Sequence, residues 1–381
     1  MTTLRVTAAA ALLVLLAAAG ASSASPPGGL GVAVGAYRFA DGSAAALVEQ
    51  DGALRLVDYR TGALRQLSQQ TRMLFVGGPG VSVPTPVSVR VALGPRRHGT
   101  VASVRVDGQT ANRIPLVTRS ATFRDGGITL AGRLIEPAGK GPFPAIVIVP
   151  GSVPAHRDTY DLWALFFASR GIAVLSYDKR GVGESTGRYV RAATDGNLRN
   201  LASDALAGVA WLRRQPGIDP QRIGLSGGSQ AGWVIALAAS RSHDVRFAAM
   251  QSGPAMSVGR QLAYSALTKD GGVDVTDEQV HAALDGVPDS GFDPRAALAG
   301  LSIPVIWQLG SVDKRMYTPE TLADLTGIDG AGTHDFSIRL YTGGAHSLRS
   351  TAHGLIAEER TSPGFVPGVF SDLGGWLRSH A

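Results

Sequence analysis

The sequence predicts an α/β protein with a doubly wound, mostly parallel sheet, preceded by a small N-terminal β domain. Three observations lead to this prediction. Continuous apolar runs such as 145–149 and 172–177 are typical of strands that are buried on both faces of a sheet. From about residue 120, segments with helical periodicity alternate with such runs. Before that point, short apolar segments are separated by Asp-Gly and Thr-Gly turns, which favours an antiparallel meander.

Residues 1–24 have the features of a secretory signal peptide. Arg5 supplies a short positive segment, residues 6–19 form an apolar run with a single Thr, and small residues around Ala21 and Ala24 offer cleavage positions. The apolar run is short for a permanent membrane span, and no other stretch of the sequence is apolar enough for one. We therefore expect a secreted, extracytoplasmic protein with no stable membrane span.

Residues 25–118 are expected to form the N-terminal β-rich domain. Its apolar segments lie at 45–48, 54–57, 63–67, 73–76, 87–91 and 101–106. The turn signals between them include Asp51-Gly52 and Asp107-Gly108. This region contains no catalytic constellation. We interpret it as a structural part of the protein, with a substrate-shaping or docking module as the alternative.

Residues 119–381 are expected to form the larger α/β domain. Its predicted strands are 128–134, 145–149, 172–177, 222–226, 245–250, 303–309 and 337–341, and its predicted helices are 161–170, 198–212, 230–240 and 373–379. Between 251 and 302 lies a helical insertion, in which Thr276-Asp277-Glu278 is a helix start signal. Because this insertion follows a predicted strand, we expect it to cover a site at the carboxyl edge of the sheet.

The composition excludes several classes of function. Apolar residues make up 44% of the 381 residues and charged residues 17%, so the chain has material for a large core and is not disordered throughout. It contains no cysteine, which excludes disulfides, a thiol nucleophile and thiolate metal sites. The formal charge is +6, but the 36 basic residues are dispersed. We therefore expect no nucleic-acid binding.

A G-x-S-x-G pattern is typical of a nucleophilic serine at a sharp strand-to-helix turn. With Ala allowed at the last position, Ser185, Ser226 and Ser229 match it. Ser185 follows a polar loop and precedes no clear helix. After Ser226 a helix would begin on Gly227-Gly228, and glycine costs on the order of 1 kcal/mol per helical position. Ser229 has a complete strand before it and an apolar helix after it, so we predict Ser229 as the nucleophile.

A serine nucleophile needs a base, usually a histidine held by a carboxylate, and in this arrangement both follow the serine in the chain. Asp313 follows the predicted strand 303–309 closely, and His346 lies in a glycine-rich turn after the strand 337–341. We predict these two as acid and base. The alternative acids are Asp324 and Asp335. The other histidines lie before Ser229 or Asp313, before the last strand, in a helix-like segment or at the chain end, and they are His98, His156, His243, His281, His334, His353 and His380.

The tetrahedral intermediate of acyl transfer needs backbone N–H groups that point at its oxyanion. One is expected from Gln230, the residue after the nucleophile, which also opens a helix. The other is expected from the loop 149–154, where we predict Ser152 as the donor and Val153 as the alternative.

Five segments in this order resemble the α/β-hydrolase superfamily, in its esterase-like branches. They are the loop 144–157, the loop Tyr177-Asp178-Lys179-Arg180-Gly181-Val182-Gly183-Glu184-Ser185, the turn at Ser229, and the turns at Asp313 and His346. The resemblance runs from about residue 118 to the C-terminus. It implies that the loop 178–185 supports the walls of the site and carries no chemistry. Two positions depart from the pattern: Ala231 replaces the second glycine, and Pro150 stands where many relatives have histidine.

These observations predict a secreted serine hydrolase that cleaves small-molecule esters or other acyl substrates through an acyl-enzyme. The chemistry implies no metal or organic cofactor. Peptide or amide hydrolysis and acyl transfer to an alcohol use the same residues and remain open, although the β region is too short for the propeller gate of a prolyl-oligopeptidase-type peptidase. A non-catalytic binding protein on a hydrolase scaffold and a surface protein that acts through its β domain are alternatives of another class.

Overall fold

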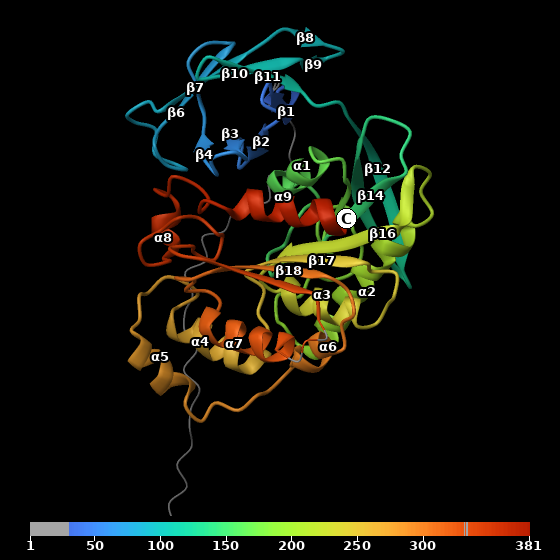
Figure 1. Cartoon of the computed structure of the whole chain (residues 1–381), viewed down its shortest axis with the longest axis vertical. Helices are drawn as coiled ribbons and strands as arrows, with labels where there is room; N and C mark the ends of the chain where they lie inside the picture. Colours follow the sequence, from blue (N-terminus) through green and yellow to red (C-terminus); the bar gives the residue numbers. More distant parts are fainter. Residues whose placement is uncertain (1–29, 331, 333) are drawn as a thin grey trace, which may run out of the picture.

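The computed structural model describes residues 30–330, 332 and 334–381. The predicted signal peptide therefore lies outside the described residues. Two sheets organise the chain, and Figure 1 shows the N-terminal sheet lying over helices α1 and α9 of the larger part. Of the helices in the described ranges, none combines the length and the apolar character needed to cross a bilayer.

The N-terminal sheet has nine antiparallel strands in the order β4-β3-β2-β1-β11-β10-β7-β6-β5. These are β1 (Gly35–Phe39), β2 (Ala44–Gln50), β3 (Ala53–Asp58), β4 (Leu64–Gln66), β5 (Ser68–Gln69), β6 (Leu74–Gly77), β7 (Val89–Leu93), β10 (Ser103–Val106) and β11 (Gln109–Arg113). A separate hairpin joins β8 (Arg96–Arg97) to β9 (Thr100–Val101). The expected turn residues Asp51 and Asp107 have positive φ, as a tight hairpin requires.

The second sheet has eight strands in the order β12-β13-β15-β14-β16-β17-β18-β19. These are β12 (Leu116–Asp125), β13 (Ile128–Pro137), β14 (Phe143–Ile148), β15 (Ala173–Tyr177), β16 (Ile218–Gly228), β17 (Phe247–Gln251), β18 (Val305–Gly310) and β19 (Phe336–Tyr341). The strands β12 and β13 are antiparallel to their neighbours, and all remaining pairs are parallel. The predicted mostly parallel sheet is thereby confirmed.

Helices cover both faces of this sheet, as doubly wound folds require. Alternate residues of β14 separate the faces. Val147 packs in the core with α2 (Asp195–Leu212), α3 (Ala231–Ala239) and α7 (Thr318–Asp329). Ile146 and Ile148 pack in the core with α1 (Asp161–Ala168) and α9 (Val369–His380). The residues 198, 201, 205, 209 and 212 predicted as one helical face are all buried.

Three helices lie between β17 and β18, in the expected insertion: α4 (Val258–Leu267), α5 (Asp277–Leu284) and α6 (Arg295–Ala299). The predicted helix start at Thr276 is a capping box, because Thr276 accepts from the Gln279 N–H and the Gln279 side chain accepts from the Thr276 N–H. A short 3-10 turn, Leu30–Val32, precedes β1, and α8 (Ile356–Glu359) precedes α9.

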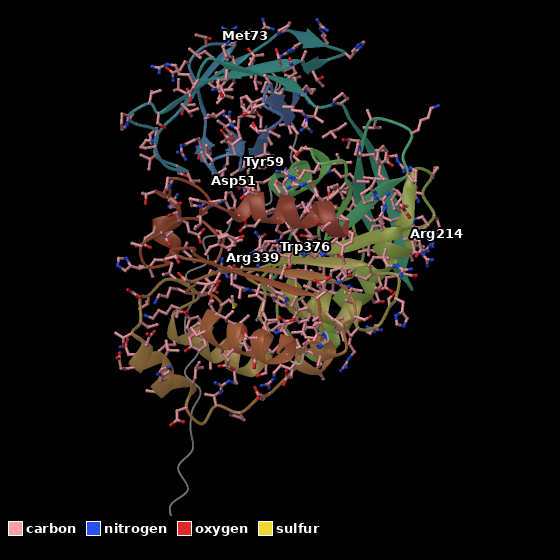
Figure 2. All side chains as sticks on the ribbon, viewed as in Figure 1. Asp51, Tyr59, Met73, Arg214, Arg339 and Trp376 are labelled. Carbon is pink, nitrogen blue, oxygen red and sulfur yellow. The ribbon has the colours of Figure 1, made fainter. Side chains whose placement is uncertain are left out.

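One hydrophobic cluster contains residues of both sheets, and each sheet contributes to a second cluster of its own. Tyr59 of the N-terminal part, labelled in Figure 2, packs edge-on against Phe166 of α1 and Phe370 of α9. Its hydroxyl donates to the carbonyl of Leu162 at 2.7 Å. Aromatic edge contacts of this kind add to the free energy of burial. The N-terminal sheet is therefore packed firmly on the helical face of the second sheet.

A segment near the C-terminus, residues 360–366, lies between the two parts and bonds to both. On one side, the Val81 N–H donates to Ser362 O and the Phe365 N–H donates to Gly62 O, each at 2.8 Å. On the other side, the Ser350 N–H donates to Gly364 O at 2.8 Å and the Val366 N–H donates to Leu348 O at 2.9 Å. Residues 348–350 directly follow the turn that carries His346. We call residues 360–366 the bridging segment.

Candidate active site

Ser229 lies between the end of β16 and the start of α3, as the sequence predicts. Its φ is 59°, in the left-handed region that side chains rarely adopt. Its N–H donates to Gln251 O at 3.1 Å, which fixes the turn against the neighbouring strand. A strained serine at a strand-to-helix turn exposes its hydroxyl above the sheet, as in a nucleophile elbow.

The other two serines that match the pattern are structural. Ser226 is a buried residue within β16, and its carbonyl accepts from the Val149 N–H. The Ser185 hydroxyl is buried as well. It donates to Asp178 O at 2.6 Å and accepts from the Ala131 N–H at 3.0 Å. Neither hydroxyl lines the pocket described below.

Asp313 and His346 are joined by a hydrogen bond of 2.7 Å between Asp313 Oδ2 and His346 Nδ1. The Asp313 side chain is buried, and its Oδ1 accepts from the N–H groups of Arg315 and Met316 at 2.7 and 2.9 Å. These bonds hold the carboxylate in one orientation. Because a carboxylate only accepts, Nδ1 carries the proton of a neutral His346, and Nε2 is the free base.

The alternative acids and bases are used elsewhere. His353 pairs with Glu358, and the ring of His334 meets the carbonyl of Leu301. His380 stacks on Trp376 near Asp335. Asp324, in α7, lies 3.8 Å from Arg295. Of these residues, none lines the pocket that contains Ser229.

The two predicted oxyanion residues flank Ser229. A Cβ placed on Gly151 would lie 3.1 Å from Gly228 O and 3.8 Å from Ser229 Cβ, so the 149–154 loop passes directly beside the nucleophile. Among the described residues, neither the Ser152 N–H nor the Gln230 N–H has a hydrogen-bond acceptor. Both residues line the pocket.

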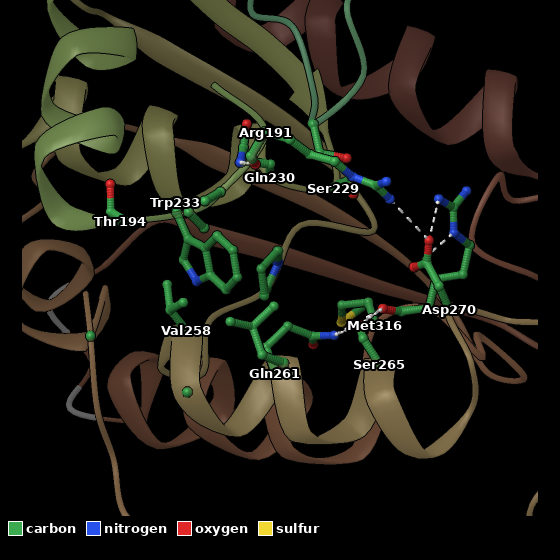
Figure 3. Close-up of a pocket in the computed structure, with 18 of the residues that line it drawn as sticks. Arg191, Thr194, Ser229, Gln230, Trp233, Val258, Gln261, Ser265, Asp270 and Met316 are labelled. Atoms are coloured by element: carbon green, nitrogen blue, oxygen red, sulfur yellow. Dashed lines mark hydrogen bonds and ion pairs between the residues drawn. The ribbon is translucent and has the colours of Figure 1, made fainter. Parts of the chain in front are cut away.

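Ser229, His346, Ser152 and Gln230 line one pocket of about 920 Å³, and Asp313 lies behind His346. Figure 3 shows Trp233 of α3 and Val258 of α4 close together, and both residues line the pocket. Helix α4 supplies much of one wall of the pocket. A mostly apolar pocket with a few convergent polar groups is typical of a small-molecule site.

Charged residues occur at one side of this pocket. Asp270, which follows α4, lies 3.5 Å from Arg191 and 3.3 Å from Arg315. Figure 3 shows these ion pairs as dashed lines beside Ser229. Arg191 precedes α2 and Arg315 follows β18, so Asp270 connects two sides of the pocket. Exposed ion pairs of this kind contribute little to stability and are weakened by salt.

Sequence reasoning did not single out Lys179, which contacts Gly151 and Gln230 but does not line the pocket. Its side chain is 1% exposed. Its Nζ donates to Gly151 O at 2.6 Å and to Gln230 Oε1 at 3.0 Å. Burial lowers the pKa of Lys179 to about 8, and the attraction of Asp204 opposes this shift. The signal in the sequence was a lysine two residues after a buried strand, where a solvated charge is not expected.

Within the described ranges, no group of three or more His, Asp or Glu side chains could hold a metal ion. A serine at a strained turn, a histidine held by a buried carboxylate and two unbonded N–H groups are the parts that acyl transfer through a covalent intermediate requires.

Comparison with known sequences gives a family and an esterase similarity. The profile of the prolyl oligopeptidase family matches residues 159–371, slightly more than half of the chain. The chain is 35% identical over 111 residues to Esterase FrsA of Escherichia fergusonii, which is 29% of this chain and 27% of that protein. It is 33% identical over 111 residues to Esterase FrsA of Escherichia coli O1:K1 / APEC, with the same coverage. The chain thus spans little more than a quarter of the length of these curated relatives.

Among solved structures, an esterase of Pyrococcus furiosus is similar in fold. Its TM-score is 0.50, with 17% sequence identity, over 70% of this chain and 92% of the other. This likeness agrees with the strand order and the helical layers described above, and it concerns the fold alone.

Proposed function

Because this chain belongs to the prolyl oligopeptidase family of α/β-hydrolases, we propose that it is a secreted serine hydrolase that cleaves carboxylic esters through a triad of Ser229, His346 and Asp313. The observation that carries the proposal is the 2.7 Å hydrogen bond between Asp313 and His346. His346 lines the same pocket as Ser229, which has a strained backbone. The esterase similarity supports the choice of ester bonds.

In the proposed mechanism, His346 Nε2 takes the proton of the Ser229 hydroxyl as its oxygen attacks the acyl carbon. Asp313 keeps the imidazole in the required tautomer and stabilises its protonated form. The carbonyl oxygen of the substrate becomes an oxyanion, which accepts from the N–H groups of Ser152 and Gln230. His346 then returns the proton to the leaving alcohol, and the acyl group stays on Ser229.

Deacylation repeats these steps with water as the nucleophile. His346 takes a proton from the water, the second tetrahedral intermediate is held by the same N–H groups, and the acid product leaves as Ser229 regains its proton. The apolar walls around Trp233 and Val258 favour an uncharged acyl or alcohol group in the pocket.

The family match favours peptide or amide bonds as the second candidate substrate class. Against a peptidase stands the N-terminal region, which is too short for a propeller gate. In the described residues that region forms a nine-stranded sheet. A panel of amides alongside the esters, and an added alcohol as competing acceptor, separate hydrolysis of esters from hydrolysis of amides and from acyl transfer.

The experiment compares purified wild type with Ser229→Ala and the matched control Ser226→Ala. Hydrolysis of p-nitrophenyl esters of increasing chain length is followed, with fluorophosphonate labelling in parallel. We expect Ser229→Ala to lose turnover and labelling, and Ser226→Ala to retain labelling because Ser226 lies within β16. Unchanged activity in Ser229→Ala contradicts the proposed nucleophile, and the absence of both signals in wild type favours a binding protein.

Secretion is tested separately by expressing the full chain with its N-terminus intact. We expect the protein to be recovered outside the cytoplasm and its intact mass to correspond to cleavage after Ala21 or Ala24. Recovery of the uncleaved chain from the membrane or the cytoplasm contradicts this part of the proposal.

A further inference from the structure

Lys179 connects the two residues whose N–H groups would bind the oxyanion. Its ammonium group donates to the carbonyl of Gly151, directly before Ser152, at 2.6 Å, and to the side-chain oxygen of Gln230 at 3.0 Å. The chain segments that carry these residues are far apart in the sequence, since one follows β14 and the other precedes α3. A single buried group therefore holds both.

The bond from Lys179 to Gly151 O also fixes the direction of the Ser152 N–H, because both groups belong to one peptide unit. The carbonyl of Gly151 and the N–H of Ser152 belong to one planar trans peptide unit and point in opposite directions. Fixing Gly151 O thus fixes the direction of the Ser152 N–H. The Gly151 N–H is itself held, because it donates to the Tyr160 hydroxyl at 3.0 Å.

The second bond acts through the Gln230 side chain. Its oxygen accepts from Lys179, and its Nε2 donates to Arg191 O at 3.1 Å. With both ends of the amide bonded, the backbone of Gln230 at the start of α3 is fixed next to Ser229. Catalysis by oriented N–H groups depends on their being in place before the reaction, so this restraint bears on the rate.

The surroundings of Lys179 argue against a role in stability. Both of its acceptors are uncharged oxygens, and no carboxylate of the described residues bonds to it. Asp204 of α2 attracts it from a distance, and the ring of Tyr189 lies 5.4 Å away. A buried cation without a bonded carboxylate destabilises a fold relative to an apolar side chain of similar size. Lys179 does not line the pocket, so it is neither nucleophile nor base.

We propose that Lys179 is a positioning residue that holds the Ser152 and Gln230 N–H groups together as one oxyanion hole. This inference rests on the proposed function. It assigns to the loop 178–185, which the sequence resemblance treats as a support without chemistry, an effect on the reaction through the oxyanion donors.

The first test compares Lys179→Met with wild type and with Lys140→Met, a control at an exposed lysine. Active sites are counted by fluorophosphonate labelling, and kcat is expressed per labelled site. We expect Lys179→Met to lose about 10- to 100-fold in kcat with KM little changed, somewhat less than the 10²–10³ that loss of one oxyanion donor costs. The labelling rate falls with kcat, whereas its final extent does not.

Rescue separates the ammonium group from general packing. Because the chain has no cysteine, Lys179→Cys can be alkylated at this one position with 2-bromoethylamine in denaturant and refolded, which restores a side chain of lysine length with a terminal amine. We expect kcat to recover toward wild type after alkylation. Lys140→Cys treated in the same way controls for the procedure.

A second variant tests the link if substitution of Lys179 prevents folding. Gln230→Met keeps the N–H but removes the acceptor of Lys179, and we expect kcat to fall with KM little changed. A wild-type kcat per site in Lys179→Met, or in Gln230→Met where Lys179→Met does not fold, overturns the inference. A wild type that neither hydrolyses nor labels contradicts the proposed function itself.

Discussion

A side chain at Gly227 would collide with Ala231 across the turn at Ser229. A Cβ on Gly227 would lie 2.7 Å from Ala231 Cβ and 2.5 Å from Val149 O. This explains why both positions are small, and why the alanine that replaces the usual second glycine is still tolerated.

Gly227→Ala is expected to destabilise the protein by about 1–3 kcal/mol, because the Cβ overpacks a site whose closest neighbour is backbone. Chemical unfolding measures this difference. Gly196 in α2 is the matched control, since a Cβ there meets nothing within 4 Å. We expect Gly196→Ala to stabilise by about 0.5–1 kcal/mol, as helix propensity predicts. Equal effects of the two substitutions would contradict the steric explanation.

Asp313→Asn is expected to lower kcat by about 10⁴, because an amide in place of the carboxylate favours the wrong tautomer of His346. The bonds to the Arg315 and Met316 N–H groups remain available to the amide oxygen, so the fold should persist. Steady-state kinetics measure the loss, and circular dichroism checks the fold. Asp335→Asn, at an exposed position, serves as the control. A loss below tenfold in Asp313→Asn would remove Asp313 from the triad.

The pKa of Lys179 near 8 predicts a pH dependence of stability. Its pKa lies below the usual 10.5, so between pH 8 and 10 the unfolded chain binds more protons than the folded protein. The free energy of unfolding contributed by this group therefore rises with pH in that window. We expect wild type to gain stability relative to Lys179→Met between pH 8 and 9.5, measured by urea unfolding. A difference independent of pH would show that Lys179 keeps an ordinary pKa.

Asp270→Asn is expected to change substrate preference rather than chemistry. Removing this carboxylate leaves Arg191 and Arg315 free beside the pocket, so esters with a distal carboxylate should bind more tightly, by ~2- to 5-fold in KM at low salt. Asp270 has a φ of 56°, which asparagine accepts readily. Kinetics with a matched pair of neutral and anionic esters test this. Asp51→Asn, in a distant ion pair with Arg55, should affect neither ester.

The positions of the candidate site residues could be predicted because each lies in a turn after a strand of the parallel sheet. Ser229 and Asp313 follow the buried ends of β16 and β18, whereas His346 follows β19, an edge strand that is mostly not buried. Lys179 follows the buried strand β15, but its neighbours Asp178 and Arg180 make the segment resemble a solvated loop. Its role depends on a contact with Gly151, and tertiary contacts of this kind leave no periodic pattern in the sequence.

The strands that were predicted best are those buried on both faces of the second sheet. The strand β12 was missed because it is an edge strand, whose residues 117–120 are largely polar and exposed. The helices α4 and α7 were missed for a related reason: each buries only three residues, so their apolar periodicity is weak. Helix α4 lines the pocket, and α7 packs on the sheet. The positions of these two helices therefore depend on tertiary contacts.

The bridging segment has a consequence for how this protein can be recombined. Residues 360–366 bond on one edge to the N-terminal part and on the other to residues 348–350, which follow His346. Removing the N-terminal part by truncation between Arg113 and Leu116 would therefore also remove the hydrogen-bond partners of residues 360–366 on one side. This segment supports the turn that carries His346. An exchange of the N-terminal sheet for that of another protein would therefore have to include residues 360–366, which lie far from the sheet along the chain.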